Sequence, residues 1–173
     1  VAHLGAIPAD RKGKDGDVLS INVQGTWNIL LGCLKADVER AVCFSSINAL
    51  GCVLGHPPAQ RLPIDDDYPR HPMSAYQLSK HLAEETCLSF SQRYHMITPC
   101  MRPVWVSNPE VSALWDTWRQ EGIMDEKMRH QYWVYVDSRD MVDATCRALS
   151  VPLVGHEAFL IAADDSITAT PTA

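Results

Sequence analysis

The chain has 173 residues, of which 46% are hydrophobic and 21% are charged, so it can bury the core of one ordinary globular domain. Its net charge of −6 and its lack of any Lys/Arg run exclude a general surface for nucleic acid or anionic membrane. No apolar run reaches the length of a bilayer span. The six cysteines have no metal-ligand spacing, which favours buried free thiols in a reducing cytoplasm and predicts no metal site.

The first third of the chain predicts a strand, a loop and a helix. An apolar run from Val1 to Ala6 predicts the end of a buried strand. Residues 8–17 are polar and rich in Gly, Pro and Asp, which is typical of a loop. Apolar residues at helical spacing then predict a helix from Val18 to Ala36, capped by Asp17 or Ser20.

The middle third predicts two strands around a long loop and a helix. The apolar run Arg40–Ser46 is typical of a central parallel strand. Residues 51–73 are rich in Gly and Pro and include three consecutive aspartates, 65–67, which are most simply a solvated part of the loop. A helix is predicted to open at Ser74 and to continue to about Tyr94. Residues 97–106 predict another strand, broken by prolines near its end.

The last third predicts a Trp-rich amphipathic stretch over residues 108–129 and then strands over 133–136 and 158–163. Between these strands, a helix over 139–150 is predicted, with a cap at Asp137 or Ser138. Its inward residues are predicted to be Met141, Val142, Ala144, Thr145 and Leu149. Strands that alternate with helices predict a doubly wound α/β sheet, in which ligands bind at the carboxyl ends of the strands.

Tyr76 and Lys80 are four residues apart, so on a helix they project from the same face. A nearby ammonium favours phenolate over phenol and lowers the pKa of a tyrosine from its reference value of about 10. Such a tyrosine can exchange a proton with a substrate hydroxyl or carbonyl. This spacing is also common on ordinary solvated helix faces, so the pair needs support from the rest of the chain.

Three separated segments give that support. Asn22-x-x-Gly25-Thr26-x-Asn28, Phe44-Ser45-Ser46 and Tyr76-x-x-x-Lys80 follow one another in the order and spacing of a known family. Together they resemble the extended short-chain dehydrogenase/reductases, the NAD-dependent epimerase/dehydratase group. Four further segments also look like parts of this family: His3-Leu4-Gly5-Ala6, Arg102-Pro103-x-Trp105-Val106, Tyr135-Val136-Asp137-x-Arg139-Asp140 and Gly155-His156-Glu157-x-Phe159. The resemblance covers nearly the whole chain and implies a Rossmann-like sheet.

The resemblance implies a catalytic tetrad of Asn22, Ser46, Tyr76 and Lys80. Tyr76 would be the general acid/base, and Lys80 would hydrogen-bond the nicotinamide ribose and lower the tyrosine pKa. Ser46 would donate to the substrate oxygen, and Asn22 would anchor a water behind Lys80. Ser46 is chosen over Ser45 because Gly51 follows it at the offset that the family keeps.

The same resemblance implies the remaining contacts. The residues expected at the cofactor, NAD or NADP with NAD favoured, are His3, Leu4, Gly5, Ala6, Asn22, Tyr76, Lys80, Pro103 and Val104. Those expected at the substrate, a sugar or nucleotide sugar, are Ser46, Ile47, Asn48, Tyr76 and Arg139. Because Ile47 and Asn48 replace the Asp and Glu of sugar dehydratases, oxidation/reduction or epimerisation is favoured over dehydration. A homodimer through helices 18–36 and 75–94 is also implied.

The chain departs from the family at its front, because none of its nine glycines forms the turn G-x-x-G-x-x-G that receives the cofactor pyrophosphate. We therefore expect an internal fragment, with residues 1–106 forming the second half of a dinucleotide-binding domain. Residues 107–173 would form part of a substrate-binding region with a returning helix and strands. The alternative is a non-catalytic, truncated Rossmann-like module that no longer binds cofactor.

Several residues also have simpler interpretations. Trp115, Trp118 and Met128 are more often core or interface residues than groups that stack on a sugar. Arg139 contacts either a substrate anion or, at least as often, the carboxylate of Asp137 or Asp143. The partners expected are therefore a small-molecule substrate and a second copy of the chain, with no nucleic acid and no membrane.

Overall fold

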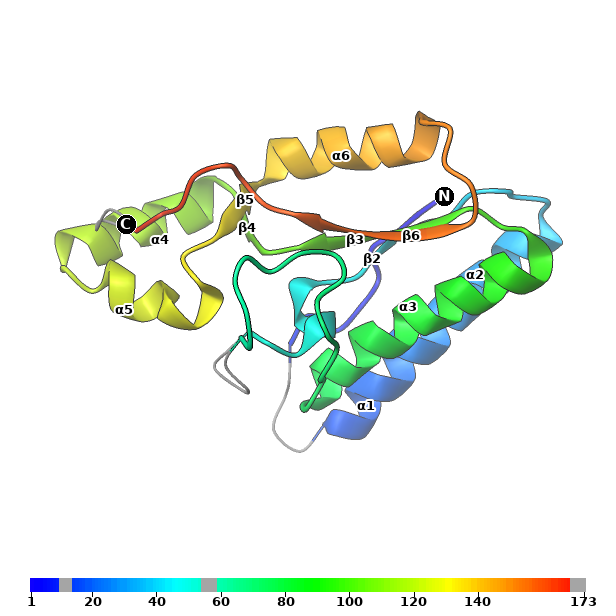
Figure 1. Ribbon diagram of the computed structural model, residues 1–173, viewed down its shortest axis with the longest axis horizontal. Helices are drawn as coiled ribbons and strands as arrows, with labels where there is room; N and C mark the ends of the chain where they lie inside the picture. Colours follow the sequence, from blue (N-terminus) through cyan, green and yellow to red (C-terminus); the bar gives the residue numbers. More distant parts are fainter. Residues whose placement is uncertain (10–13, 54–58, 169–173) are drawn as a thin grey trace.

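The computed structural model describes residues 1–9, 14–53 and 59–168. Its centre is a fully parallel sheet in the order β1–β2–β3–β6. The strands are Ala2–His3, Val42–Phe44, Thr98–Pro103 and His156–Ile161. Helices α2 (Gly25–Lys35) and α3 (Ala75–Tyr94) lie on one side of the sheet, and α6 (Ser138–Ser150) lies on the other (Figure 1). The predicted Rossmann-like α/β architecture is confirmed.

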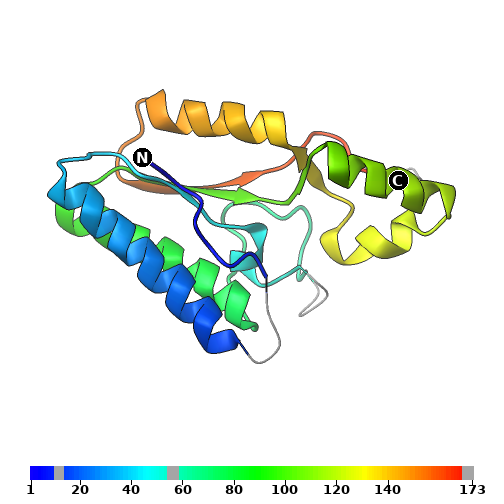
Figure 2. The ribbon, with the colours of Figure 1, turned by 180° about the vertical axis from the view of Figure 1, so that it is seen from behind.

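A second, smaller group of elements lies beyond the carboxyl end of the sheet. Strands β4 (Trp105–Ser107) and β5 (Tyr135–Asp137) pair in parallel, and α4 (Pro109–Gln120) and α5 (Met124–Met128) pack beside them. Figure 2 shows these helices at the opposite end of the molecule from the amino ends of β2 and β3. The chain then returns to the main sheet through α6 and β6. The boundary at residues 106 and 107 stays a prediction.

The first helix is longer than expected and contains a wider turn. Helix α1 (Asp15–Leu19) continues through a π-helical turn (Ser20–Gln24) into α2 without a break. The predicted caps are wrong, because Asp17 and Ser20 both lie inside the helical run and no side chain caps its start. Asp15 and Asp17 instead place two carboxylates in the first turn, where the positive end of the helix dipole favours them.

The third strand breaks near its end, as predicted, directly after Pro103. Pro99 and Pro103 both lie within β3, and the strand stops only at Val104, before β4 begins. Strand β2 pairs with β3 only at Cys100 and Met101. The two prolines, which have no N–H to donate, therefore flank this pairing rather than interrupt it.

Alternating residues of the central strands face two different layers of the core. Val42 and Met101 belong to an apolar cluster with Met141 and Ala148 of α6. The next residue along β2, Cys43, and the preceding residue on β3, Cys100, pack instead with Leu30, Cys87 and Phe90 of the α2–α3 layer. This period of two is the geometry of a strand that is buried on both faces.

Helix α6 buries a different stripe from the one predicted. Met141 and Ala148 are buried, whereas Val142 is 63% exposed and Leu149 is 40% exposed. Residues 141, 144, 145 and 148 follow the helical period and form the stripe that faces the sheet. Val142 and Leu149 lie one residue past it, so the prediction that they face inward is wrong. Of the six cysteines, only Cys146 on this helix is exposed. No helix in the described ranges is long and apolar enough to cross a membrane.

Candidate functional site

The start of α3 fixes the direction of the predicted Tyr-Lys pair. Ser74 caps the helix by accepting a hydrogen bond from Gln77 N at 3.2 Å, and Gln77 Oε1 accepts one in return from Ser74 N at 3.2 Å. This reciprocal capping stabilises the first turn. Tyr76 lies in that turn, and Lys80 Nζ lies 5.8 Å from the centre of its ring. The predicted helix and the predicted approach of the two side chains are both observed.

Lys80 is buried, with 6% of its surface exposed, and its Nζ donates a hydrogen bond to Phe44 O at 2.8 Å. Burial lowers the pKa of Lys80 from its ordinary value, while the ionisable groups of Cys100, Cys43 and Glu84 oppose that shift. A backbone carbonyl is a neutral partner. Burial therefore disfavours the charged form of Lys80, and the hydrogen bond to Phe44 O and the nearby Glu84 carboxylate favour it.

Three successive residues at the end of β2 are each held by a different partner. Phe44 O accepts from Lys80, and the Ser45 hydroxyl donates to Glu84 Oε1 at 2.5 Å. Ser46 Oγ accepts from both Asn48 N and Asn48 Nδ2, each at 3.2 Å. The Ser45 hydroxyl is therefore bound to Glu84, although Ser45 also lines the cavity described below. Among the described residues, no acceptor is recorded for the proton of the Ser46 hydroxyl.

Glu84, one turn beyond Lys80 on α3, is the centre of a buried charge network. Arg102 Nε and Nη2 donate to its two carboxylate oxygens at 2.9 and 2.8 Å, and Arg70 Nη1 lies 3.2 Å from Oε2. Burial, the strongest influence on Glu84, would raise its pKa. The bonds from Arg102 and Ser45 outweigh burial and hold the pKa below its usual value. The network ties α3 to β2 and β3 directly behind the predicted site.

A cavity of about 390 Å³ collects six of the predicted site residues. They come from the end of β2, the start of α3 and the end of β3: Ser46, Ile47, Asn48, Tyr76, Pro103 and Val104. Within this lining, the Asn48 Oδ1 atom is buried and has no hydrogen-bond partner among the described residues. The cavity lies at the carboxyl end of the parallel sheet, where α/β proteins of this kind bind their ligands.

Asn22, in the π-helical turn, is 2% exposed. Its side-chain amide is hydrogen-bonded to the backbone of Ile7 and to a side chain of α3. Its Oδ1 accepts from Ile7 N at 2.7 Å, and its Nδ2 donates to Ile7 O at 3.1 Å and to Ser79 Oγ at 2.9 Å. These bonds pin the segment after β1 against the helix that carries Tyr76 and Lys80. The predicted role of Asn22 in anchoring a water stays a prediction.

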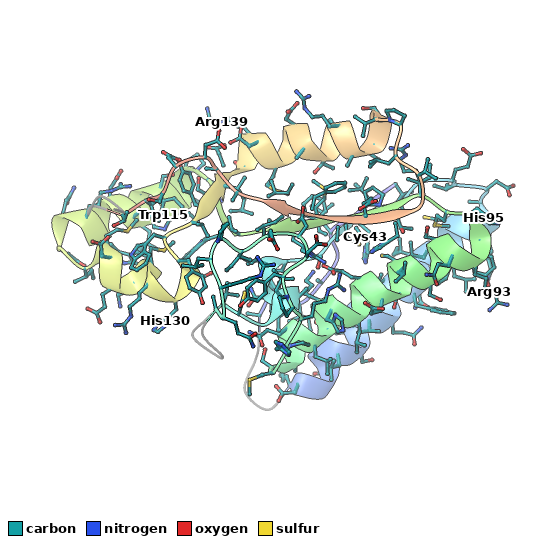
Figure 3. All side chains as sticks on the ribbon, in the orientation of Figure 1. Cys43, Arg93, His95, Trp115, His130 and Arg139 are labelled. Carbon is teal, nitrogen blue, oxygen red and sulfur yellow. The ribbon has the colours of Figure 1, made fainter. Side chains whose placement is uncertain are left out.

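The structure does not bring the other predicted residues to this cavity. His3 Nε2 lies 3.3 Å from Thr26 Oγ1, and burial, followed by the charge of Lys80, lowers the pKa of His3. Leu4 is 60% exposed and lines a different, apolar cavity beside α6. Arg139 is at the start of α6, where its guanidinium binds both oxygens of Asp137 at 2.9 Å; Figure 3 labels it on the outer surface.

Sequence reasoning missed two sets of residues. The cavity is also lined by Pro8, Ser45, Trp105, Val106 and Gln131. Trp105 and Val106 belong to the segment that resembles the family, although the resemblance implied no contact for them, and no local pattern marks Pro8 or Gln131. Glu84 and Arg102 carry the charge network, and they did leave a signal in the sequence. Arg102 is a charged residue in an apolar strand, and Glu84 is four residues after Lys80 on the buried face of a helix. Because buried charges are almost always paired, one buried carboxylate and one buried guanidinium together predict an ion pair.

The parallel sheet, with its Ser46 and Tyr76 cavity at the carboxyl end, defines a Rossmann-like fold. Residues 1–162 match the NAD dependent epimerase/dehydratase family, and the chain belongs to that family. A curated relative from Pseudomonas syringae, "Uronate dehydrogenase", is 26% identical over 156 residues, which cover 90% of this chain and 48% of that protein. A relative from Methanocaldococcus jannaschii named "Putative UDP-glucose 4-epimerase" is 41% identical over 80 residues, 46% of this chain and 24% of that protein.

The solved structure of MoeE5 in complex with UDP-glucose and NAD has the same fold as this chain. The TM-score is 0.73, the sequence identity is 24%, and the match covers 95% of this chain and 56% of that one. The chain thus spans half or less of the two curated relatives and little more than half of this structure.

Proposed function

We propose that the chain carries the proton-transfer site of an NAD(P)-dependent oxidoreductase or epimerase acting on a hydroxyl or carbonyl of a sugar or nucleotide sugar. The observation that carries this proposal is the shared cavity of Ser46 and Tyr76, with the Lys80 ammonium beside the tyrosine ring. Family membership and the uronate dehydrogenase relative support the same reaction class.

Each side chain has one role in this proposal. Ser46 Oγ accepts two bonds from Asn48 and has no recorded acceptor for its proton among the described residues, so that proton would be donated to the substrate oxygen and would orient it. Tyr76 exchanges the proton of the reacting hydroxyl, and the positive charge of Lys80 stabilises its phenolate form. Asn48 holds Ser46 in place through its backbone N and its Nδ2, and Ile47 and Asn48 stay candidates for substrate contact. Arg139 stays a weaker candidate for a substrate anion.

The residues present fit the nicotinamide end of the cofactor. Within the described residues, Lys80 Nζ donates one hydrogen bond, to Phe44 O, and an ammonium has three N–H donors. The other two suit the hydroxyls of the nicotinamide ribose. Pro103 and Val104 in the cavity would contact the nicotinamide, and His3, Leu4, Gly5 and Ala6, outside the cavity, would contact the cofactor as the family resemblance implies. When bound, the nicotinamide supplies or accepts the hydride.

The pyrophosphate half of the cofactor has no matching turn in this sequence, whose nine glycines are dispersed. This is the observation that favours the second candidate, a non-catalytic module that retains the tetrad but holds no cofactor. We favour NAD over NADP, although similar solved structures contain either NAD or NADPH.

A homodimer through α2 and α3 completes the proposal. Large apolar side chains are exposed on this pair of helices and on the π-helical turn before α2: Ile21 at 52%, Trp27 at 42%, Ile29 at 40% and Leu82 at 37%. Sedimentation at increasing concentration tests the dimer, and Leu82→Glu, which places a charge on the shared face, is expected to shift the chain to monomer. A chain that sediments as a monomer at every concentration would rule this contact out.

The function is tested by titrating NADH and NADPH against the 173-residue chain and following energy transfer from its tryptophans. Micromolar binding that Lys80→Met weakens about tenfold or more would support the nicotinamide site, since one charge-assisted bond is lost. Tyr76→Phe should leave this binding intact while turnover of a uronate or UDP-sugar falls by about 10²-fold to 10⁴-fold. Absence of binding would favour the non-catalytic module, and retained turnover in Tyr76→Phe would remove Tyr76 from its role.

A further inference from the structure

One carboxylate, that of Glu84, is bonded to both strands whose ends form the cavity of Ser46 and Tyr76. Ser45 donates to its Oε1 at 2.5 Å, and Arg102 Nε and Nη2 donate to its two oxygens at 2.9 and 2.8 Å. The side chain of Glu84 has no exposed surface, and that of Arg102 is 1% exposed. These charge-assisted hydrogen bonds are among the stronger kinds in proteins, and here they lie in the interior.

Each of these two partners of Glu84 stands directly before a residue of the cavity. Ser45 lines the cavity itself and precedes Ser46, and Arg102 precedes Pro103. Because the backbone of a strand advances only about 3.3 Å per residue, a side chain that is fixed at one position leaves the next residue little freedom. The bonds to Glu84 therefore determine where the ends of β2 and β3 present their cavity residues.

Glu84 also lies on the face of α3 that carries the predicted acid/base pair. Tyr76, Lys80 and Glu84 follow one another at intervals of four residues, so they share one face of the helix. Lys80 Nζ donates to Phe44 O at 2.8 Å, one residue before Ser45. The helix is therefore tied to the end of β2 at two successive residues, once through Lys80 and once through Glu84.

The two arginines beside Glu84 differ in what they can hold. Arg70 is partly exposed, and its Nη1 lies 3.2 Å from a Glu84 oxygen and 3.0 Å from an oxygen of Glu85. Arg102 binds both oxygens of Glu84, and such a bidentate pair fixes direction as well as distance. A carboxylate that is held in this way resists displacement when a ligand enters, as a preorganised site requires.

We propose that Glu84 is a positioning residue of the Ser46–Tyr76–Lys80 site. It acts through Ser45 and Arg102, and it fixes the distance between the strand end that carries Ser46 and the helix face that carries Tyr76 and Lys80. This inference rests on the proposed function, because only a reaction at the site needs that distance. The geometry itself can be measured in the chain alone, without cofactor or turnover.

The experiment follows the ammonium group of Lys80 in the 173-residue chain by ¹⁵N NMR, and Lys80→Met assigns its signal. Glu84→Asp keeps the charge but is one methylene shorter, so from the same backbone position it cannot reach both Ser45 and Arg102. We expect this variant to move the Lys80 signal, because the bond from Lys80 to Phe44 O is displaced. Where NADH binds, its affinity should fall about threefold to tenfold for the same reason.

Three further variants separate positioning from charge and from stability. Ser45→Ala breaks the network at its other end without removing a charge, and it should also move the Lys80 signal. Glu85→Gln removes the exposed carboxylate on the next residue and should leave the signal in place. Leu30→Ala opens a cavity in the apolar cluster of the α2–α3 layer, so it lowers stability but should leave the signal in place.

Two results would overturn the proposal. One is a Lys80 signal that stays in place in either Glu84→Asp or Ser45→Ala. The other is an equal movement in Leu30→Ala, which would make the effect one of stability alone. If Glu84→Asp does not fold, Ser45→Ala decides by itself. Failure of the proposed function would look different, because the native chain would then bind no NADH while its Lys80 signal still responded to these variants.

Discussion

Around α3, buried polar side chains meet partners from other elements, whereas around α4 aromatic rings mainly meet one another. Glu84 binds Arg102 of β3 and Ser45 at the end of β2, and Lys80 binds Phe44. Near α4, Trp105 packs edge to face on Trp115 and Trp118. The first region depends on directional bonds whose loss leaves a partner buried and unpaired. The second depends on buried area, which tolerates small changes.

The largest expected effect comes from Glu84→Gln. Removing this charge leaves the buried Arg102 guanidinium without its counterion, so the free energy of unfolding should fall by about 3–5 kcal/mol. Glu85→Gln on the next residue is the control, because that side chain is 47% exposed and should change stability by less than about 0.5 kcal/mol. Urea denaturation measures the free energy of unfolding of both variants. Equal values for Glu84→Gln and Glu85→Gln would show that the buried charge network adds nothing to stability.

The stability lost in Glu84→Gln should also depend on pH. Burial alone would raise the pKa of Glu84, but Arg102 and Ser45 hold it below its ordinary value. A carboxylate with a depressed folded-state pKa contributes stability above its unfolded value of about 4.3, and loses it as the pH falls through the folded value. The stability gap between the native chain and Glu84→Gln should therefore narrow below about pH 4.3. If this difference in unfolding free energy stayed constant with pH, the loss of stability would not come from the charge of Glu84.

Gly51→Ala should have the next largest effect. Gly51 has a φ of +78°, and a Cβ added there would lie 2.1 Å from His71 O, a backbone atom that cannot move aside easily. We expect a loss of about 2–4 kcal/mol from strain and displacement of the chain. Gly32→Ala in α2 is the matched control, because its Cβ meets nothing within 4 Å and should stabilise the helix by about 0.5–1 kcal/mol.

These positions also show what the sequence could predict. The start of α3 follows from Ser74, and the choice of Ser46 over Ser45 came from the spacing to Gly51. In the structure, that spacing accompanies a left-handed turn pressed against His71. The π-helical turn at residues 20–24 has no local signature and was missed. The Glu84–Arg102 pair spans 18 residues, and only the topology of the sheet brings its members together.

Ser45 and Ser46 should respond in opposite ways, by smaller amounts. Ser45→Ala removes a buried bond to a carboxylate and should cost about 1.5–3 kcal/mol of stability. Ser46 caps only a short 3₁₀ turn over Ile47–Leu50, so Ser46→Ala should cost about 0.5–1 kcal/mol. Turnover, in contrast, should fall more in Ser46→Ala than in Ser45→Ala. If Ser45→Ala lowered turnover more than Ser46→Ala without a matching loss of stability, the choice of Ser46 would be wrong.

Trp133→Phe tests the aromatic region with the smallest expected change. The substitution keeps a ring but removes the bond from Nε1 to Asp125 O, which joins the segment before β5 to α5. The loss should cost about 0.5–1.5 kcal/mol. Because this bond is local, the loss should appear in hydrogen exchange as faster opening of α5, with the amides of α3 unchanged. Faster exchange in both helices would mean that the aromatic region and the α3 region unfold as one unit, and the contrast between them would then lie only in the kind of contact that each uses.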